Sequence, residues 1–572
     1  MNDVIDRPFE LPTVAAPEGG ATAVALALAA SLAACGGGGG DAPPSGGSGS
    51  GGSGSGSGAS IADAEAARFL AQSSMGASRA QISRVQALGY AGWIDEQLAL
   101  PASPTRWSFL VAAGFDAPTY KNTEAGFDAA AWSKLIAGPD TLRQRMTLAL
   151  SEMMVAAIDG LVGGGWRSFA AAAYLDLLEA NAFGLHRTLM QQISTSAAMG
   201  EFLTFRASMK ANLVSGALPD ENYAREVMQL FTIGLVQLNL DGTPQLSGGA
   251  ATYTYAQADI TGLARVFTGW DFDLQGQSGA VGTATPDFMR RPMTQIASRH
   301  ESGAKTFLGV TIPPGTDGVQ SLKVALDTIC AHPNVGPFTS RQLIQRLVTS
   351  NPSPAYVARI AAVFNDDGSG VRGNLKAVLK ALLLDDEARN LATAAGPSFG
   401  KLKEPMLRFT AWARAWNVAS ASNAWAVGNT SDPASRLGQS PLRSPSVFNF
   451  FRPGYVPPNS AIASAALVAP EFQITNESSV VGYVNFLQRA VAGNLGDLKA
   501  DYTSLLALAD DAAALVAEIA LVLAAGQLAA ATLSSISTAV GSMPSGSAPS
   551  RQNRVNASLV LVLAAPEFIV QK

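Results

Sequence analysis

The chain has 572 residues and a formal net charge of −5, with 15% charged and 48% hydrophobic residues. This length permits a large buried core, and the composition is too apolar for an intrinsically disordered protein. The small negative charge provides no basic surface of the kind that binds nucleic acid, so we expect no nucleic-acid partner.

An apolar run near the N-terminus, residues 21–34, is too short to span a membrane and leads into Leu32-Ala33-Ala34-Cys35. This ending resembles the lipobox of bacterial lipoproteins, which predicts a signal segment over residues 1–35 and lipidation of Cys35. The flank ahead of the run departs from that pattern, because it holds Glu18 and only one distant basic residue, Arg7. The alternative is an alanine-rich tail with an incidental cysteine.

Residues 36–60 consist almost entirely of Gly and Ser, which is typical of a flexible tether. Together with a lipid on Cys35, this tether predicts a protein anchored to a membrane of the bacterial cell envelope and facing the periplasm or the cell surface. With Cys35 lipidated, Cys330 is the only other cysteine, so no intrachain disulfide is expected.

From residue 61 onward, the apolar spacing predicts a mainly α-helical protein, a large bundle-like domain with long irregular loops and little β-structure. We expect a main helical domain over residues 61–480 and alanine-rich C-terminal helices over residues 481–572 that pack on it. Asp140 is placed to cap a helix, and Thr254 to Gln257 has the spacing of a capping box. Successive helices joined by short turns are expected over residues 317–330, 336–349, 353–364 and 374–384.

Residues 219–234 contain the densest set of side chains that could take part in catalysis or ligand binding. Pro219 suits the first turn of a helix, and Gly234 suits its C-terminal end. The polar face of this helix carries Asn222, Arg225, Glu226 and Gln229. One interpretation is that this face is exposed to solvent and carries a Glu221–Arg225 ion pair at i,i+4 spacing. The alternative is that it forms a polar cluster facing a cleft between helices.

A long alanine-rich stretch, residues 501–540, carries no charge from Ile519 onward. Its length alone would permit a membrane span. Because Gln527 and several Ser and Thr residues interrupt it, we expect a buried core helix instead.

Short motifs occur in order along residues 61–572. They include Arg68-Phe69-Leu70, Leu142-Arg143-Gln144-Arg145, Glu221-Asn222-Tyr223-Ala224-Arg225-Glu226, Phe267-Thr268-Gly269-Trp270, Lys403-Glu404-Pro405 and the segment from Pro445 to Tyr455. In these motifs the chain resembles the bacterial domain of unknown function 1800 family. The resemblance implies an exported, mainly helical protein, often encoded beside a second exported protein, and it implies no catalytic residue. Members often carry His-Pro before Met-Gly, whereas this chain has Ser196-Ala197-Ala198.

Signatures of metal and nucleophile chemistry are missing from the sequence. The three histidines, His186, His300 and His332, are not spaced as zinc ligands, so we expect neither a metal site nor a cofactor. Cys330 lies in an apolar helical stretch, where a thiol is usually inert.

Carboxylates remain as groups able to perform acid/base chemistry. The catalytic candidates are Glu226, Arg225, Asn222, Glu221, Asp259 and Trp270. Glu221 and Glu226 project about 140° apart on a helix, so neither can serve as the other's partner across one bond. The second carboxylate of a pair would be Asp259, Asp271 or Glu404. In the structural alternative, Arg225 clamps a carboxylate and fixes the packing of the helices.

We therefore expect a lipid-tethered protein with an interaction or assembly role at the bacterial cell envelope and an exported protein as its partner. The proline- and aromatic-rich segment 448–458 is suited to present a docking surface. The alternative is a hydrolase that acts on an envelope or extracellular polymer by carboxylate acid/base chemistry. Whether the protein is an enzyme stays open on the sequence alone.

Overall fold

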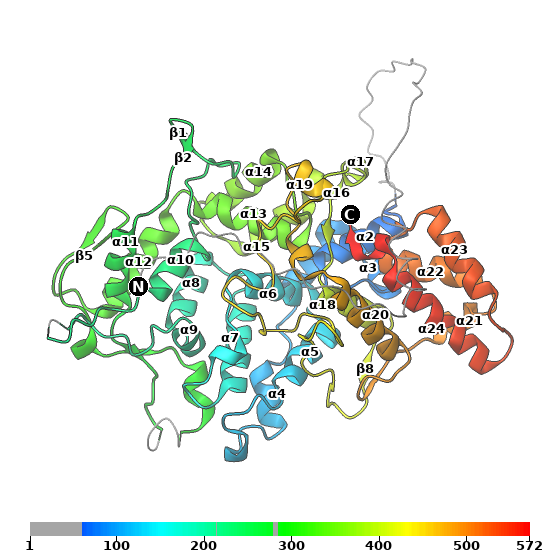
Figure 1. Ribbon diagram of the computed structural model, residues 1–572, viewed down its shortest axis with the longest axis horizontal. Coiled ribbons are helices and arrows are strands. Elements are labelled where there is room, and N and C mark those ends of the chain that lie inside the picture. The colour runs from blue at the N-terminus through cyan, green and yellow to red at the C-terminus, as the bar shows by residue number, and fades with distance from the viewer. Residues whose placement is uncertain (1–59, 213, 278–283) are drawn as a thin grey trace, which may run out of the picture. The chain divides into compact units, whose positions relative to one another are not determined.

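Helices dominate the computed structural model, which describes residues 60–212, 214–277 and 284–572 (Figure 1). The expected mainly α-helical fold class is confirmed. Ser60–Lys572 forms one compact unit. The expected signal segment with Cys35, and the tether up to residue 59, lie outside the described residues. Among the helices of residues 60–212, 214–277 and 284–572, none is both long and apolar enough to span a membrane.

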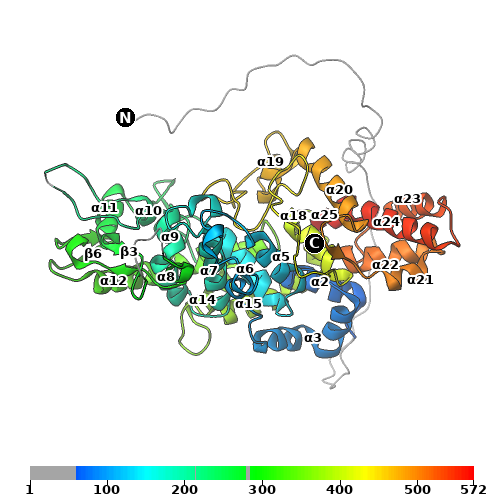
Figure 2. The same cartoon turned by 90° about the horizontal axis from the view of Figure 1, so that it is seen from below.

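The first half of this unit is built from helices joined by long loops. They are α2 (Asp63–Ser73), α3 (Arg79–Ala99), α4 (Arg106–Ala112), α5 (Phe127–Ala137), α6 (Thr141–Met153), α7 (Arg167–Ala180), α8 (His186–Thr195), α9 (Ala197–Phe202), α10 (Asn222–Gln229) and α11 (Gln257–Ala264). Helices α6 and α7 pack on each other, and α10 packs on α11 (Figures 1 and 2).

The second half continues with α12 (Gly318–Ala331), α13 (Val335–Leu347), α14 (Pro354–Asn365), α15 (Leu375–Leu384), α16 (Asp386–Arg389), α17 (Leu391–Ala394), α18 (Pro405–Ala415), α19 (Ala461–Ser464), α20 (Glu477–Val491), α21 (Thr503–Leu508), α22 (Ala512–Ala524), α23 (Ala530–Gly541), α24 (Ala548–Ala564) and α25 (Pro566–Ile569). Helix α13 packs along both α14 and α6, and α22 lies against α2 near the start of the described chain.

Every described strand is short and belongs to a two-stranded antiparallel ladder. The ladders are β1 (Leu246–Ser247) with β2 (Ala250–Ala251), β3 (Trp270–Asp271) with β4 (Thr294–Gln295), β5 (Lys305–Phe307) with β6 (Val310–Ile312), β7 (Lys401–Leu402) with β10 (Val570–Gln571), and β8 (Ala419–Ser420) with β9 (Leu498–Lys499). In the β7–β10 ladder Gln571 lies opposite Lys401, so the C-terminal residues are fixed beside the start of α18.

Two apolar cores stabilise this arrangement. The first is built by helices from α2 to α15 and includes Trp93 and Trp166, and the second is built mainly by α18 and α20–α25 and includes Trp412. Helix α6 contributes to both cores, with Met146 in the first and Leu148 in the second. Residues on α6 are therefore well placed to couple the two halves.

Side-chain caps explain why several helices begin where the sequence predicts. Asp317 accepts a hydrogen bond from the backbone N–H of Gln320 at 2.8 Å, and Ser353 and Asn374 make the equivalent bonds at the starts of α14 and α15. Two expected caps are wrong. Asp140 precedes α6 but makes no side-chain capping bond to its backbone, and the Thr254 hydroxyl donates to the Gly234 carbonyl. Helix α11 begins later, where the Asp259 carboxylate accepts from the N–H of Ala256.

The alanine-rich stretch over residues 501–540 is not one helix, contrary to expectation. It forms α21, α22 and α23. The break after α22 has a local cause, since Ala525 and Gly526 both adopt left-handed backbone angles, with φ of 54° and 68°.

Candidate functional site

Helix α10 carries the candidates Asn222, Arg225 and Glu226 and begins after Glu221, and both Glu221 and Arg225 bond to Gln257 of α11. Glu221 accepts hydrogen bonds from the Gln257 amide at 2.8 Å and from the Thr261 hydroxyl at 2.7 Å. The expected i,i+4 pair is present, with 3.6 Å between Arg225 Nη2 and Glu221 Oε2. Since these bonds link two neighbouring helices, Glu221 and Arg225 have a structural role here.

Glu226 is 7% exposed, and its Oε2 has no hydrogen-bond partner among the described residues. Burial raises the pKa of Glu226, and the nearby charge of Arg225 opposes that rise. Asn222, one turn earlier, donates to the Thr204 hydroxyl at 3.4 Å. Glu226 is thus a buried carboxyl, and in the described structure Asn222 and Arg225 turn to other partners.

The other sequence candidates have partners of their own. Asp259 caps α11 and also accepts from the N–H of Leu308 at 2.7 Å. Asp271 forms ion pairs with Arg206 and Arg299 at 3.0 and 2.8 Å. Trp270 lies opposite Gln295 in the β3–β4 ladder. The hydrogen bonds and ion pairs of the described residues do not gather these side chains around Glu226.

A different set of charged side chains is collected in the interior, and we call it the buried charge cluster. Its members are Arg145, Glu152, Arg346, Lys401, Glu404 and Glu471, and each is at most 5% exposed. They come from α6, α13, β7, the start of α18 and the 3-10 turn Pro470–Ile474. Of these residues, sequence reasoning had named only Glu404 as a possible catalytic carboxylate.

Hydrogen bonds connect the cluster through backbone and side chains. Arg145 Nη2 and Lys401 Nζ both donate to the Arg346 carbonyl, at 2.6 and 2.7 Å. Lys401 Nζ also lies 3.0 Å from Glu471 Oε1 and 3.8 Å from Glu404 Oε1. Because a buried charge is costly without a partner, this density of opposite charges is what keeps the cluster in the interior.

The two carboxyl groups of Glu152 and Glu404 titrate as a pair. Burial, together with the charge of Glu404 and a hydrogen bond to it, raises the pKa of Glu152 well above its usual value. Burial also acts to raise the pKa of Glu404, but the Glu152 hydrogen bond and the charges of Lys401 and Arg145 outweigh it and lower that pKa to about 2. The two environments therefore shift the pKa values in opposite directions, and Glu152 holds the proton of the pair in preference to Glu404.

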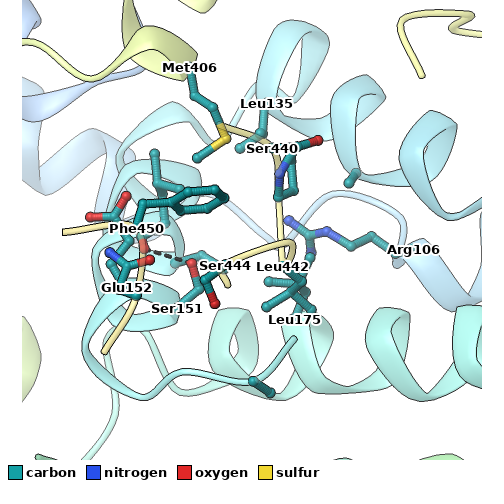
Figure 3. Close-up of a pocket in the computed structure, with 16 residues that line it drawn as sticks. Arg106, Leu135, Ser151, Glu152, Leu175, Met406, Ser440, Leu442, Ser444 and Phe450 are labelled. Atoms are coloured by element: carbon teal, nitrogen blue, oxygen red, sulfur yellow. Dashed lines mark hydrogen bonds between the residues drawn. The ribbon is translucent and has the colours of Figure 1, made fainter. Parts of the chain in front are cut away.

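Glu152 lines two cavities. The larger, which we call the groove, has a volume of about 370 Å³. Its walls are α13, the chain from Gln229 to Leu238 and the segment Val447–Gly454, and the buried Glu152 and Arg346 lie at its base. The smaller cavity, of about 30 Å³, has Glu152, Ser151 and Ser444 on one side and Arg106 on the other (Figure 3). It has room for a single water molecule.

Gly234 shapes one wall of the groove. Its φ is +70°, and a Cβ atom at this position would lie 2.8 Å from the ring of Phe338 on α13. Glycine, which tolerates this backbone angle, therefore allows the chain after α10 to pass close to α13.

The groove is apolar along its walls and basic in its charge. Arg341, Arg346 and Arg452 line it, and Glu152 is the only acidic residue among its lining residues. Arg452 lies over the ring of Phe448 at 4.4 Å, and Arg346 over that of Phe451 at 4.7 Å. Such a cavity can bind a ligand that offers both apolar and anionic groups.

No group of His, Cys, Asp and Glu in the described ranges is arranged as a metal site. His186 and His300 are buried singly, and His300 Nδ1 lies 2.9 Å from the Thr268 carbonyl oxygen. Burial raises the pKa of the Cys330 thiol to about 12, which leaves it unreactive at neutral pH.

Three of the sequence motifs meet around the groove and the buried charge cluster. Arg145, Glu404 and the Pro445–Tyr455 segment belong to three separate motifs, and all three contribute to this region. A family model described as "Protein of unknown function (DUF1800)" matches residues 68–570. No curated protein and no solved structure matches the chain. The family match spans nearly all of the described residues, and the chain therefore belongs to the DUF1800 family.

Proposed function

We propose that this protein is exported, is tethered through a lipid on Cys35 and acts as an interaction or assembly protein at the bacterial cell envelope. The observation that carries the proposal is the groove, a cavity of about 370 Å³ on the folded unit, beyond the Gly/Ser tether. A lipid and a slack tether hold a folded domain near a membrane, where a groove of this kind can receive part of an exported partner.

The segment Val447–Gly454 supports a docking role. Val447 and Phe448 are half-buried and line the groove, while Phe451 is fully buried beneath them. Gln345 on α13 donates to the Pro453 carbonyl at 3.4 Å and to the Ser350 carbonyl at 3.0 Å. The segment is thus anchored at Phe451 and Pro453 and presents Phe448 to a ligand.

The test is site-directed photocrosslinking in native membranes combined with fractionation. A photoreactive residue at Leu235, which lines the groove and is 48% exposed, is expected to give one discrete crosslinked product. The same residue at Val319 on α12, which is 62% exposed and outside the groove, is the matched control. Cys35→Ala protein is expected to leave the membrane fraction. Equal crosslinking at both positions, or membrane retention of Cys35→Ala, would contradict the proposal.

A second candidate function, hydrolysis of an envelope or extracellular polymer, is favoured by the Glu152–Glu404 pair. Acid/base hydrolysis uses carboxyl groups with separated pKa values, and the environments of Glu152 and Glu404 shift their pKa values in opposite directions. Because the two groups hydrogen-bond each other and only Glu152 lines the groove, Glu152 is the member that could act on a bound polymer. This candidate replaces Glu226 by Glu152 as the acid. Its test is release of soluble fragments from purified peptidoglycan or exopolysaccharide, with Glu152→Gln as the inactive control.

A further inference from the structure

The charge of the groove indicates what its occupant must offer. Three guanidinium groups, those of Arg341, Arg346 and Arg452, line it together with a single carboxyl group, that of Glu152. Glu152 is neutral when it holds the proton shared with Glu404. The lining therefore has an excess of positive charge that its own residues do not neutralise.

The hydrogen-bonding state of the three arginines separates them into two kinds. Arg346 is 3% exposed, and its Nη1 lies 3.5 Å from Glu152 Oε2. Arg341 and Arg452 are exposed, and neither side chain forms an ion pair or a hydrogen bond within the described structure. Their guanidinium forks are free to bind a carboxylate with two parallel N–H···O bonds.

The carboxyl group of Glu152, at the base of the groove, also has unused hydrogen-bonding capacity. Apart from the proton that it shares with Glu404, neither of its oxygens has a hydrogen-bond partner among the described residues. One oxygen of Glu152 engages the proton of the pair, and Oε2 lies 3.5 Å from Arg346 Nη1 without a hydrogen bond, so it can still accept from a ligand N–H. A carboxyl oxygen with unused acceptor capacity, on a side chain that is 5% exposed and lines the cavity, points to a bound polar group.

The walls specify the rest of the occupant. They present mostly apolar side chains, including Leu230, Leu235, Val236, Phe338, Val447 and Phe448. An extended peptide offers alternate side chains to opposite sides, together with backbone N–H groups. A lipid acyl chain offers no backbone N–H, and a polysaccharide offers little apolar surface to these walls.

We infer that the groove binds an extended segment of the partner protein in which Asp or Glu alternates with apolar residues, with a carboxylate held by Arg341 and Arg452 and a backbone N–H directed at Glu152. This inference rests on the proposed interaction function and specifies the partner's chemistry. The apolar side chains of the segment lie against Phe338 and Phe448.

The experiment measures peptide binding by the full chain in detergent, using fluorescence anisotropy. The probe is a short fluorescein-labelled peptide that alternates Glu with Leu, and the matched probe replaces each Glu by Gln. Because a charge-assisted hydrogen bond contributes about 1.5–3 kcal/mol, the Glu peptide is expected to bind at least roughly tenfold more tightly. Its affinity is expected to fall with added salt.

Two variants connect this preference to the groove. Arg341→Gln and Arg452→Gln are each expected to reduce the preference for Glu over Gln several-fold, on the order of the loss of one charged pair. Arg84→Gln, which changes an exposed arginine paired with Glu96 outside the groove, is the matched control and is expected to leave it unchanged. Arg341 and Arg452 form no ion pair or side-chain hydrogen bond within the described structure, and Arg452 loses only its contact with the half-buried Phe448 ring, so both variants are expected to keep a Tm close to that of the wild type.

The outcomes distinguish this inference from the proposed function. Equal binding of the two peptides, or a preference unaffected by Arg341→Gln and Arg452→Gln, overturns the acidic-segment inference. Binding of inorganic phosphate or of anionic vesicles by a protein that does not bind the Glu peptide also overturns it. That result indicates a phosphate-bearing ligand. If groove-specific crosslinking at Leu235 persists in those cases, the interaction function stands. If the Glu peptide binds selectively but Leu235 gives no product in membranes, the interaction function fails instead.

Discussion

The Nη1 atom of Arg346 lies 3.5 Å from Oε2 of Glu152, at the point where the groove meets the buried charge cluster. A ligand at the base of the groove therefore approaches a carboxyl group whose proton is shared with Glu404. The backbone carbonyl of Arg346 also accepts hydrogen bonds from the side chains of Arg145 and Lys401. The cluster therefore fixes the position of α13, which forms one wall of the groove. We expect changes in the cluster to alter both stability and groove binding.

The first prediction concerns the proton on Glu152. Because the folded protein raises the pKa of Glu152, its contribution to stability is complete below its ordinary pKa near 4.5 and is lost as pH rises toward the folded value. Glu152→Gln keeps a neutral donor to Glu404 and removes this loss. Among the groups that face Glu152, namely Arg145, Arg346, Lys401 and Glu404, none is changed by the substitution. In urea unfolding measured across pH, the free energy of unfolding of Glu152→Gln is expected to increase relative to that of the wild type as pH rises.

A control separates this effect from a general change in charge. Glu477→Gln removes an exposed carboxylate at the start of α20 and is expected to follow the wild-type pH profile. Parallel profiles for wild type and Glu152→Gln would show that folding does not raise the pKa of Glu152.

The second prediction concerns Glu404, the ionised member of the pair. Its pKa of about 2 means that its contribution is complete above its ordinary pKa near 4.5 and is lost as pH falls toward 2. Glu404→Gln leaves Lys401 and Arg145 with less opposing charge in the interior. Removing one partner of a buried pair typically costs about 3–5 kcal/mol, so we expect a loss of that order in urea unfolding at pH 7. A loss below about 1 kcal/mol, typical of an exposed pair, would contradict the assigned ionisation.

The third prediction concerns Lys403, which is buried beside the ring of Phe568, with Nζ 4.2 Å from the ring centre. Burial, followed by the charge of Arg408, lowers its pKa from 10.5 to about 7. Between these values the unfolded chain binds more protons, so stability is expected to rise with pH from about 7 to 10.5. In Lys403→Met this rise is expected to disappear and stability at pH 7 to increase. Lys376→Met, on an exposed face of α15, serves as the control.

The fourth prediction separates anchoring from docking within the segment Val447–Gly454. Phe451 is fully buried under Arg346, and truncation of such a side chain costs about 3–5 kcal/mol, so Phe451→Ala is expected to lower Tm strongly. Phe448 is half-buried and lines the groove, so Phe448→Ala is expected to weaken peptide binding with a much smaller change in Tm. Calorimetry and anisotropy on both variants check this. Similar losses of Tm would show that Phe448 is part of the core.

Local signals in the sequence were sufficient for much of the fold. Helices α12, α14 and α15 begin within one residue of the predicted positions, because the helical pattern and the caps that the structure shows at Asp317, Ser353 and Asn374 are local features of the chain. The helix predicted from Pro219 begins later, at Asn222, with Glu221 as its N-cap. A local signal also failed at Thr254, whose hydroxyl is bonded to the Gly234 carbonyl, a residue 20 positions away in the chain.

The candidate site was mostly beyond the reach of sequence reasoning. Glu152 lies on α6 and Glu404 at the start of α18, and no periodicity within either segment indicates that the two carboxyl groups meet. Glu226 attracted attention because it lies in a dense polar motif, yet the groove begins at Gln229, nearly one turn later. The motifs at Arg145, Glu404 and Pro445–Tyr455 were the one signal that pointed to this region, because all three belong to the family resemblance.

The most direct test of the central claim, that the groove receives a partner segment, is photocrosslinking from Leu235 in intact envelopes, compared between wild type and an Arg341→Gln, Arg452→Gln double variant. The wild-type groove is expected to give one discrete product that is identified by mass spectrometry as an acidic, partly apolar segment of an exported protein. The double variant is expected to lose most of that product while keeping its Tm. An undiminished product in the double variant, or a product of equal intensity from Val319, would contradict the account.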